Sequence, residues 1–299
     1  MITVLGSINM DLIATTPRLP EPGETVAGTG FSTAAGGKGA NQALAARRAG
    51  SSVHMAGAVG EDGFASPALA LLNEAGVDLS AVTRSSEPTG TAQILVSGDG
   101  ENMIVVVPGA NGTIDDDQAH IAVGTMRAGS LLMLQLEIPA ASVERALLSA
   151  RAQHIVSILN TAPLTPEAAK LAELADIVIA NETEFSLLVG KQITQAAERE
   201  AAMLAWHSTR GQALIVTLGG EGVIAVRNGV VHTAKGLDIV PVDTVGAGDT
   251  FCGYLVSGLE QGLDFPDALR RAAIAGSLAC LKAGAQPSIP TAQDVAAHL

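Results

Sequence analysis

The stretch DTVGAGDTF, residues 243–251, places an acid directly behind two glycines and directly ahead of an apolar segment. Apolar residues recur there at helical spacing, as at Phe251 and Leu255, which predicts a buried helix from about Asp249 to Gly262. The first N–H groups of a helix have no partners within it and favour negative charge. Asp249 could therefore be a simple helix cap, or a base held beside a second anion.

The two glycines of this stretch favour the second interpretation. Gly246 and Gly248 would let backbone N–H groups point inward as an anion-binding nest. An aspartate beside an anion is unfavourable in a site that only binds, but it suits a hydroxyl held between Asp249 and a phosphoryl group. Asp249 would then take the proton as the oxygen attacks phosphorus. A dinucleotide fingerprint is excluded because Phe251 stands where its third glycine belongs.

A second glycine-led stretch, GGKGANQALAARRAG at 36–50, predicts a helix that ends at Gly50, with Lys38 and Asn41 in its first turn. It is not a P-loop, because Lys38 is followed by glycine rather than by serine or threonine. The functional interpretation is a cradle of backbone and side chains for a polar ligand. The alternative is a helix that merely begins at glycines.

The sequence NETE at 181–184 follows a strand-like run. Its oxygen-bearing side chains suit Mg²⁺, which prefers oxygen ligands and keeps several waters. A helix N-cap formed by Asn181 or Thr183 explains the same residues nearly as well.

Composition limits the classes of partner. The net charge is −13 and no cluster of Lys and Arg is present, which argues against nucleic acid and anionic membranes. No apolar run is long enough to span a bilayer and the N-terminus lacks a signal-peptide pattern, so we expect a cytoplasmic protein. Cys252 and Cys280 have no metal-like spacing and are expected to be free thiols.

Apolar runs of strand length alternate with segments of helical length at 139–152, 166–175 and 194–210. This alternation predicts βαβ units and a mostly parallel, Rossmann-like sheet flanked by helices. Polar residues or glycines follow five of the runs, which predicts a ligand cleft along one edge of the sheet. They are Asn9, Asp11, Glu137, Asn160, Asn181, Glu184, Gly219 and Gly220.

Residues 11–35 and 90–108 break this rhythm with alternating, β-branched runs and Gly-Asp-Gly turn chemistry. They predict a small inserted β-sheet, either a lid over the cleft or a pair of surface hairpins. The remaining residues, 1–10, 36–89 and 109–299, would form the α/β domain.

Taken together, the motifs resemble those of the ribokinase family of sugar kinases, in the family's order and over nearly the whole chain. The two signatures are GGKGANQA at 36–43 and DTVGAGDTF at 243–251. The other matching pieces are VLGSINMD at 4–11, LPEPGET at 19–25, GEN at 100–102, QLE at 135–137, NETE at 181–184, TLGGEG at 217–222 and KAGAQPSIP at 282–290.

The resemblance implies roles for particular residues. Asp249 would be the base, with the N–H groups of Ala247 and Gly248 as an anion hole. The implied sugar contacts are Asn9, Asp11, Gly37, Lys38, Asn41, Glu137 and Asp249. The implied nucleotide-site residues are Asn181, Glu184 (near Mg²⁺), Thr217, Gly219, Gly222, Gly246, Gly248 and Ala273. The implied ligands of a monovalent cation, K⁺, are Asp243, Val245, Ala279, Lys282, Gly284 and Ser288, mostly through backbone oxygens.

The implied activity is transfer of the ATP γ-phosphoryl group to the 5-hydroxyl of a furanose, D-ribose first. A nucleoside or deoxyribose kinase of the same family is the nearest alternative, and a non-catalytic sugar-binding regulator is a more distant one. Few aromatic residues are available to stack a nucleobase, which favours the free sugar. Cys252 and Ala273 depart from the family's usual residues and leave the nucleotide preference open. The resemblance also implies a homodimer through the edge strands of the lid.

Overall fold

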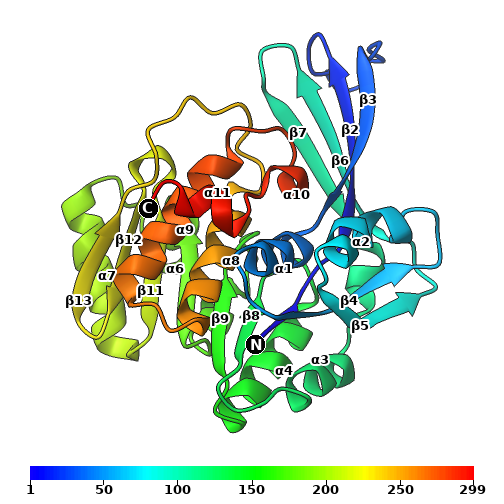
Figure 1. Cartoon of the computed structure of the whole chain (residues 1–299). Helices are drawn as coiled ribbons and strands as arrows, with labels where there is room; N and C mark the ends of the chain where they lie inside the picture. The colour runs from blue at the N-terminus through cyan, green and yellow to red at the C-terminus, as the bar shows by residue number, and fades with distance from the viewer.

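The computed structural model describes residues 1–299 as an α/β domain from which a small sheet projects (Figure 1). The main sheet has nine strands, in the order β13-β12-β11-β10-β9-β8-β1-β4-β5. Its strands are β1 Ile2–Leu5, β4 Val53–Gly60, β5 Asp78–Ser85, β8 Leu131–Leu134, β9 Val156–Asn160, β10 Ile177–Asn181, β11 Ala213–Thr217, β12 Val223–Arg227 and β13 Val230–Ala234.

The strands from β11 to β5 pair in parallel, and only β12 and β13 at one edge are antiparallel. The predicted mostly parallel sheet is therefore confirmed. Because parallel strands end at one edge, the residues that follow β1, β8, β9, β10 and β11 are brought together there.

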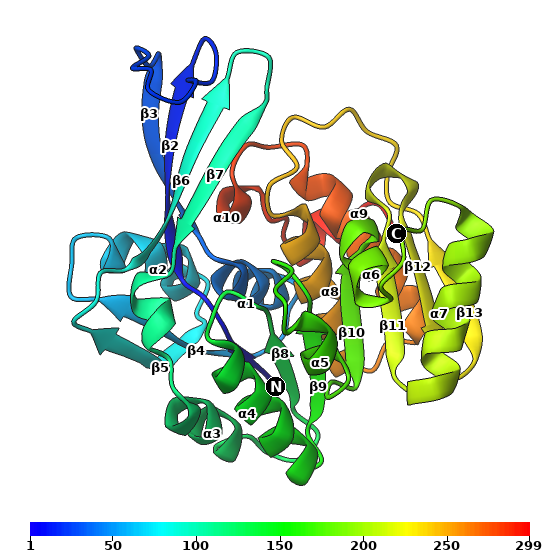
Figure 2. The same ribbon diagram turned by 180° about the vertical axis from the view of Figure 1, so that it is seen from behind.

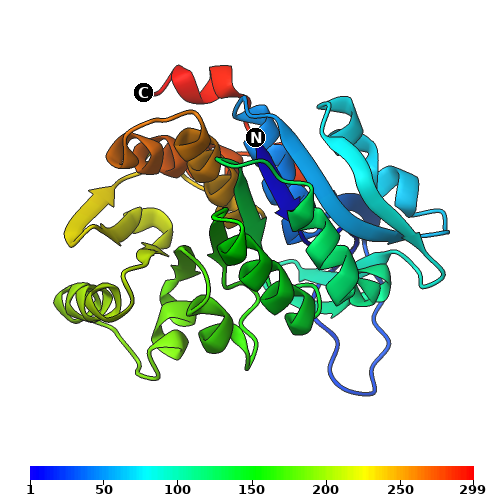
Figure 3. The same cartoon turned by 90° about the horizontal axis from the view of Figure 1, so that it is seen from below.

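Helices cover both faces of the sheet, as Figure 2 and, from below, Figure 3 show. One apolar core packs α1, α2, α8 and α9 on one face, and a second packs α3 to α7 on the other. The helices are α1 Lys38–Arg48, α2 Ala65–Glu74, α3 Asp116–Gly124, α4 Ala140–Ala152, α5 Ala168–Ala172, α6 Glu182–Leu188, α7 Ala196–Arg210, α8 Ala247–Glu260, α9 Phe265–Ala279, α10 Ala285–Ser288 and α11 Ala292–Ala296, with 3₁₀ turns η1 Gly109–Thr113 and η2 Gly219–Glu221.

The small sheet contains β2 Asn9–Thr16, β3 Gly30–Gly36, β6 Gly90–Ser97 and β7 Asn102–Val107, in the order β3-β2-β6-β7. Two antiparallel hairpins are joined by a parallel β2–β6 pair. Its strands fall close to the stretches expected from the sequence. It stands away from the α/β domain with its root beside α1 (Figures 1 and 2).

The small sheet begins two residues earlier than expected, at Asn9 rather than at residue 11. Asn9 and Asp11 thus lie within β2 and do not follow one long strand over residues 2–8. The chain leaves the main sheet at Gly6, where a Cβ would meet the side-chain oxygen of Gln135 at 2.1 Å. Apolar residues lie on both sides of Gly6, so the apolar run in the sequence continues past the point where β1 ends.

No helix combines the length and the apolar character needed to cross a membrane.

Candidate active site

Two hollows meet at the carboxyl edge of the main sheet and share Lys38, Gly246 and Asp249. The small-sheet pocket, of about 610 Å³, lies between the small sheet and the start of α1. The strand-end pocket, of about 230 Å³, lies over the ends of β9, β10 and β11. A group in one pocket can therefore approach a group in the other beside Asp249.

The small-sheet pocket collects all seven residues for which the sequence implied sugar contacts. They are Asn9, Asp11, Gly37, Lys38, Asn41, Glu137 and Asp249. Apolar side chains of β6 and β7, such as Ile94 and Val106, line its other side. Its lining contains no aromatic residue.

Glycines at 36 and 37 bring the backbone close to this pocket. A Cβ on Gly36 would lie 2.5 Å from both carboxylate oxygens of Asp11. Gly37 has a φ of +90°, and a Cβ there would lie 2.7 Å from the backbone nitrogen of Asn9. Position 37 therefore requires glycine, whereas a side chain at position 36 would displace the Asp11 carboxylate from the pocket.

The start of α1 is capped by residues distant in sequence. Its N-cap, Gly37, has no side chain to cap it. The backbone N–H of Lys38 donates to Oε2 of Glu137 at 3.0 Å, and the hydroxyl of Ser7 donates to the same oxygen at 2.5 Å. The N–H groups of Gly39 and Ala40 donate to the Ser7 side chain and backbone oxygen. Glu137 therefore neutralises this helix end.

Asp249 is buried and does not cap α8, because no side-chain cap hydrogen bond is present and its carboxylate points elsewhere. Its Oδ2 accepts a hydrogen bond from Nδ2 of Asn41 at 2.9 Å, and its Oδ1 accepts one from Nε2 of Gln42 at 2.9 Å. The cap alternative from the sequence is thus not what the structure contains. The carboxylate is held between the two pockets by α1.

The start of α8 is open. Gly246 has a φ of +77° and packs so closely on Ala285 that a Cβ would lie 2.9 Å from the Ala285 Cα. The N–H of Ala247 makes a long, 3.3 Å bond to the Thr244 carbonyl, whereas the N–H groups of Gly248 and Asp249 donate to no protein atom. A Cβ on Gly248 would meet nothing within 4 Å. This end can accept an anion.

Charges in the two pockets are strongly unbalanced. Lys38 is the one cationic side chain that lines either hollow. The nearby carboxylates, Asp249 first, raise the pKa of Lys38 despite its burial, so it stays charged. Burial, reinforced by Glu137 and Asp249, raises the pKa of Asp11 to about 6. A bound nucleotide polyphosphate would therefore need a further cation.

The strand-end pocket contains Asn181, Glu184 and Thr217 among the predicted nucleotide residues, together with Asn160. Asn181 and Glu184 form a capping box at the start of α6, so the cap interpretation holds for the backbone. Glu184 also accepts from the hydroxyl of Thr161 at 3.3 Å. Its carboxylate is thus largely occupied by protein donors.

Three predicted nucleotide residues do not line this pocket, namely Gly219, Gly222 and Ala273. Gly222 has a φ of +98°, and a Cβ there would lie 2.2 Å from the carbonyl oxygen of Ala234. It is required to turn the chain into β12. Ala273 is buried in the core on α9.

Asp243 joins the two segments in which the cation ligands were expected. Its Oδ1 accepts from the N–H of Val245 at 2.9 Å, and its Oδ2 accepts from the N–H of Gly284 at 2.8 Å. Of the other expected ligands, Ser288 is buried and its hydroxyl donates to the Ala285 carbonyl, while Lys282 is exposed, with its N–H 3.5 Å from the Ala279 carbonyl oxygen. No group of three or more His, Cys, Asp or Glu side chains could hold a metal ion.

Sequence reasoning missed three buried amides that support the site: Gln42, Gln135 and Asn111. Asn111 donates to Oδ1 of Asn9 at 2.7 Å. Its side chain also accepts from the N–H of Ile8 and donates to the Ile8 carbonyl oxygen. Gln42 follows Asn41 in the GGKGANQA motif, and that adjacency was the one available signal. Nothing local distinguishes Asn111 from a turn residue.

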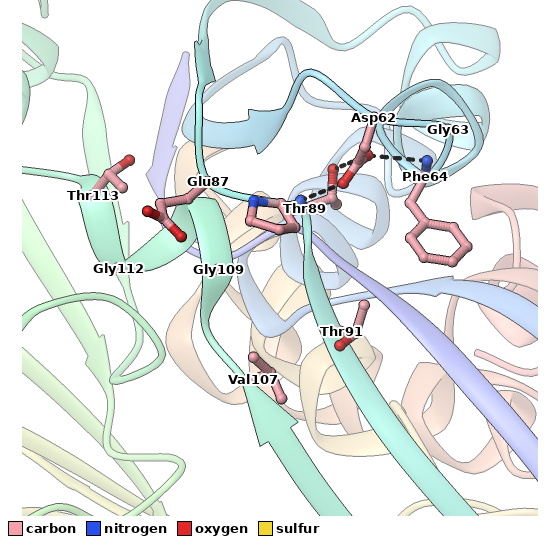
Figure 4. A pocket seen from close by; sticks show the side chains of 11 residues that line it. Asp62, Gly63, Phe64, Glu87, Thr89, Thr91, Val107, Gly109, Gly112 and Thr113 are labelled. Atoms are coloured by element: carbon pink, nitrogen blue, oxygen red, sulfur yellow. Dashed lines mark hydrogen bonds between the residues drawn. The ribbon is translucent and has the colours of Figure 1, made fainter.

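A third hollow, of about 690 Å³, lies on the opposite face of the root of the small sheet (Figure 4). Thr91 and Val107 face it, whereas their neighbours Ala92 and Val106 face the small-sheet pocket, as alternation along a strand requires. The carboxylate of Asp62 accepts hydrogen bonds from the N–H and the hydroxyl of Thr89 and from the N–H of Phe64. These bonds satisfy its carboxylate, and the other acid of the lining, Glu87, is exposed to solvent.

Comparison with known proteins gives consistent matches. A family model described as pfkB family carbohydrate kinase matches residues 1–292. A ribokinase of Bacillus subtilis is 37% identical over 98% of this chain and 97% of its own length. A deoxyribokinase of Salmonella typhi is 31% identical over 100% of this chain and 98% of its own. The structure of an Arabidopsis thaliana ribokinase complexed with ribose and ATP superposes with a TM-score of 0.86, at 33% identity over 99% of this chain and 97% of that one.

Proposed function

The chain belongs to the pfkB family of carbohydrate kinases, and we propose that it transfers the γ-phosphoryl group of ATP to the 5-hydroxyl of D-ribose. The chain is an ATP-dependent sugar kinase. The observation that carries the proposal is the meeting of two pockets at Asp249, with the open start of α8 beside it.

The sugar would occupy the small-sheet pocket. Asp11, Glu137 and the side-chain oxygen of Asn41 would accept hydrogen bonds from ring hydroxyls, while Asn9 and Lys38 would donate them. The side-chain oxygen of Asn41 is buried without a partner, which suits a hydroxyl donor. Losing one charged partner in such a site costs about 1.5–3 kcal/mol.

Asp249 would orient the 5-hydroxyl and take its proton during in-line attack. The N–H groups of Ala247 and Gly248 would hold the charge that develops on the phosphoryl group. Of these two, Gly248 has a free donor, and the adjacent Asp249 N–H is a further one that the sequence did not suggest. Lys38 would add positive charge from the sugar side.

The polyphosphate of ATP would lie in the strand-end pocket, near Asn181, Glu184 and Thr217. The oxygen-rich lining fits Mg²⁺ held mainly by phosphate and water, with Glu184 acting through water, because no protein cluster supplies three acidic ligands. Mg²⁺ would supply the charge neutralisation that Lys38 alone does not. Gly219, Gly222 and Ala273 would contribute, if at all, on the adenosine side, outside this pocket.

A K⁺ ion would be held by Asp243 and backbone oxygens of the segments around Val245, Ala279, Lys282, Gly284 and Ser288. Hydrogen bonds of Asp243 to both segments support this arrangement. The ion would fix the loop that precedes α8 without touching a substrate.

The small sheet would act as the lid of the sugar pocket, because its inner face supplies Ile94 and Val106 to that pocket. Every residue of its edge strand β7 is exposed, including the apolar run Met103–Val107. An exposed apolar edge strand is prone to pairing. We therefore propose a homodimer through the lids, in a cytoplasmic protein.

Deoxyribose is the second candidate acceptor, because a deoxyribokinase is among the relatives. A nucleoside is less well suited, since the pocket offers no aromatic side chain for the base. The test is ATP consumption with ribose, 2-deoxyribose, fructose, adenosine and inosine, followed by NMR of the product. Ribose should give the highest kcat/KM and ribose 5-phosphate; no turnover with any acceptor would support a sugar-binding regulator instead.

A further inference from the structure

Gln42 is a residue of α1 whose side chain contacts Asp249 of α8. It is fully buried and lines neither pocket. Its Nε2 makes two hydrogen bonds, to Oδ1 of Asp249 at 2.9 Å and to Oδ1 of Asn160 at 3.1 Å. Its Oε1 accepts a third, from Nε2 of Gln135 at 2.7 Å. Gln42 lines neither pocket, yet its nitrogen bonds two residues that do, Asp249 and Asn160.

The order of donors along this chain of amides follows from the carboxylate. An ionised carboxylate can only accept, so the nitrogen of Gln42 must face Asp249. The oxygen of Gln42 then faces Gln135, and Gln135 must present its own nitrogen. A flip of either amide would set two oxygens against each other.

Gln135 is buried as completely as Gln42, and its remaining oxygen has no hydrogen-bond partner. That oxygen rests against Gly6, where a Cβ would lie 2.1 Å from it. Leaving a buried acceptor unpaired costs free energy. A residue retained at such a cost is better explained by the fixed orientation of Gln42 than by packing alone.

We propose that Gln42 is a positioning residue for the phosphoryl transfer: the Gln135–Gln42 pair fixes the rotation of the Asp249 carboxylate, so that the Asn41-bonded Oδ2 faces the sugar. Asn41, which lines the small-sheet pocket, donates to Oδ2 of Asp249. Gln42 donates to Oδ1 of Asp249 and also to Asn160, which lines the strand-end pocket. This inference rests on the proposed role of Asp249 as base.

The test is Gln42→Met, which keeps the length and removes both polar functions. A carboxylate free to rotate is misplaced by about an ångström, which can cost about 10²-fold in rate. We expect kcat to fall at least tenfold, with the KM values for ribose and ATP changed less than about twofold.

Gln212→Met is the matched control. Gln212 is another buried glutamine with three hydrogen bonds, to Trp206, Ala172 and Ala175, remote from both pockets. The Gln212→Met variant should lower thermal stability comparably and leave kcat unchanged. Gln135→Met, which leaves Gln42 in place without its fixed orientation, should lower kcat by a smaller factor, again with little change in KM, and it stands in if Gln42→Met does not fold.

The inference is overturned if Gln42→Met keeps the parental kcat, or changes it no more than Gln212→Met does. Asp249→Asn, measured in parallel, tests the proposed base separately from the role of Gln42. Near-normal turnover of Asp249→Asn would refute the base itself, whereas an inactive Asp249→Asn beside a normal Gln42→Met would refute only the role of Gln42.

Discussion

The N-terminal ends of α1 and α8 point into the same site but are completed differently. Both follow a glycine with positive φ, Gly37 and Gly246, and neither has a side-chain cap on its N-cap residue. At α1, Ser7 and Glu137 satisfy the first three N–H groups. At α8, two of the first three N–H groups donate to no protein atom.

The difference supports the proposal that the two ends hold different ligands. The end of α1 already holds a carboxylate, so it would repel a further anion and would present Glu137, Lys38 and Asn41 to a neutral, hydroxyl-rich molecule. The end of α8 is free to hold a phosphoryl group. In the proposed function, the sugar and the phosphoryl group would thus be kept apart until they meet at Asp249.

Removing the proposed base beside the start of α8 should give the largest fall in kcat. Asp249→Asn keeps the size of the side chain but accepts no proton, and its single oxygen can accept from only one of the two α1 amides, Asn41 and Gln42. General-base catalysis contributes about 10²–10⁴-fold, so kcat should fall by that order while ATP still binds. Steady-state kinetics and ATP titration calorimetry measure both; turnover near the parental value would contradict the assignment.

The second effect concerns the loop that opens the α8 end. If K⁺ shapes the segment between Asp243 and Gly246, misaiming one donor costs about 10²–10³-fold in rate. The protein should be strongly activated by K⁺ over Na⁺, and Asp243→Ala should lose that preference.

The measurement is kcat in K⁺, Na⁺ and tetramethylammonium at constant ionic strength. Equal rates in all three would mean that the hydrogen bonds of Asp243 to Val245 and Gly284 hold the loop without an ion.

The third effect tests the α1 side. Glu137→Gln removes the charge that caps α1 and faces the small-sheet pocket. A charged hydrogen-bond partner is worth about 10- to 150-fold in affinity, so the KM for ribose should rise by that order with the KM for ATP almost unchanged. Equal damage to both values would indicate a folding defect, which the melting temperature would reveal.

The smallest expected effect is the pH dependence of kcat/KM for ribose, which we attribute to Asp11 in the small-sheet pocket. The raised pKa of Asp11, about 6, means that its carboxyl is protonated below that pH in the free protein. If ribose needs the ionised form, kcat/KM for ribose should fall about tenfold per pH unit below about 6, while kcat/KM for ATP at saturating ribose should not follow. Asp11→Asn should abolish this limb, and a limb that survives in Asp11→Asn would assign it to another group.

The same shift makes a stability prediction. Between the ordinary carboxyl pKa of 3.8 and about 6, the folded protein binds the proton on Asp11 and the unfolded chain does not. The free energy of unfolding should therefore fall as pH rises through this window, by about 1.4 kcal/mol for each unit of the shift. Asp11→Asn should lack that component in denaturant titrations at pH 4 and 7.

The sequence by itself determined the α/β class, the helix that starts near Asp249 and the residues that could do chemistry. These follow from local rules: apolar spacing sets helices and strands, and a glycine pair marks backbone that other residues cannot adopt. The motifs at 36–43 and 243–251 also pointed to sugar phosphorylation, and the comparisons agree.

Only the tertiary structure decided what each charged group contacts. Whether Asp249 caps its own helix depends on amides more than 200 positions earlier in the chain, Asn41 and Gln42, and the α1 end depends on Glu137, 99 positions later than Lys38. The packing of α8 against α1 in one core creates the first contacts, and the pairing of β8 beside β1, whose ends meet, creates the second. Local sequence contains no record of that order, so a cap and a base could not be told apart from the residues around Asp249 alone.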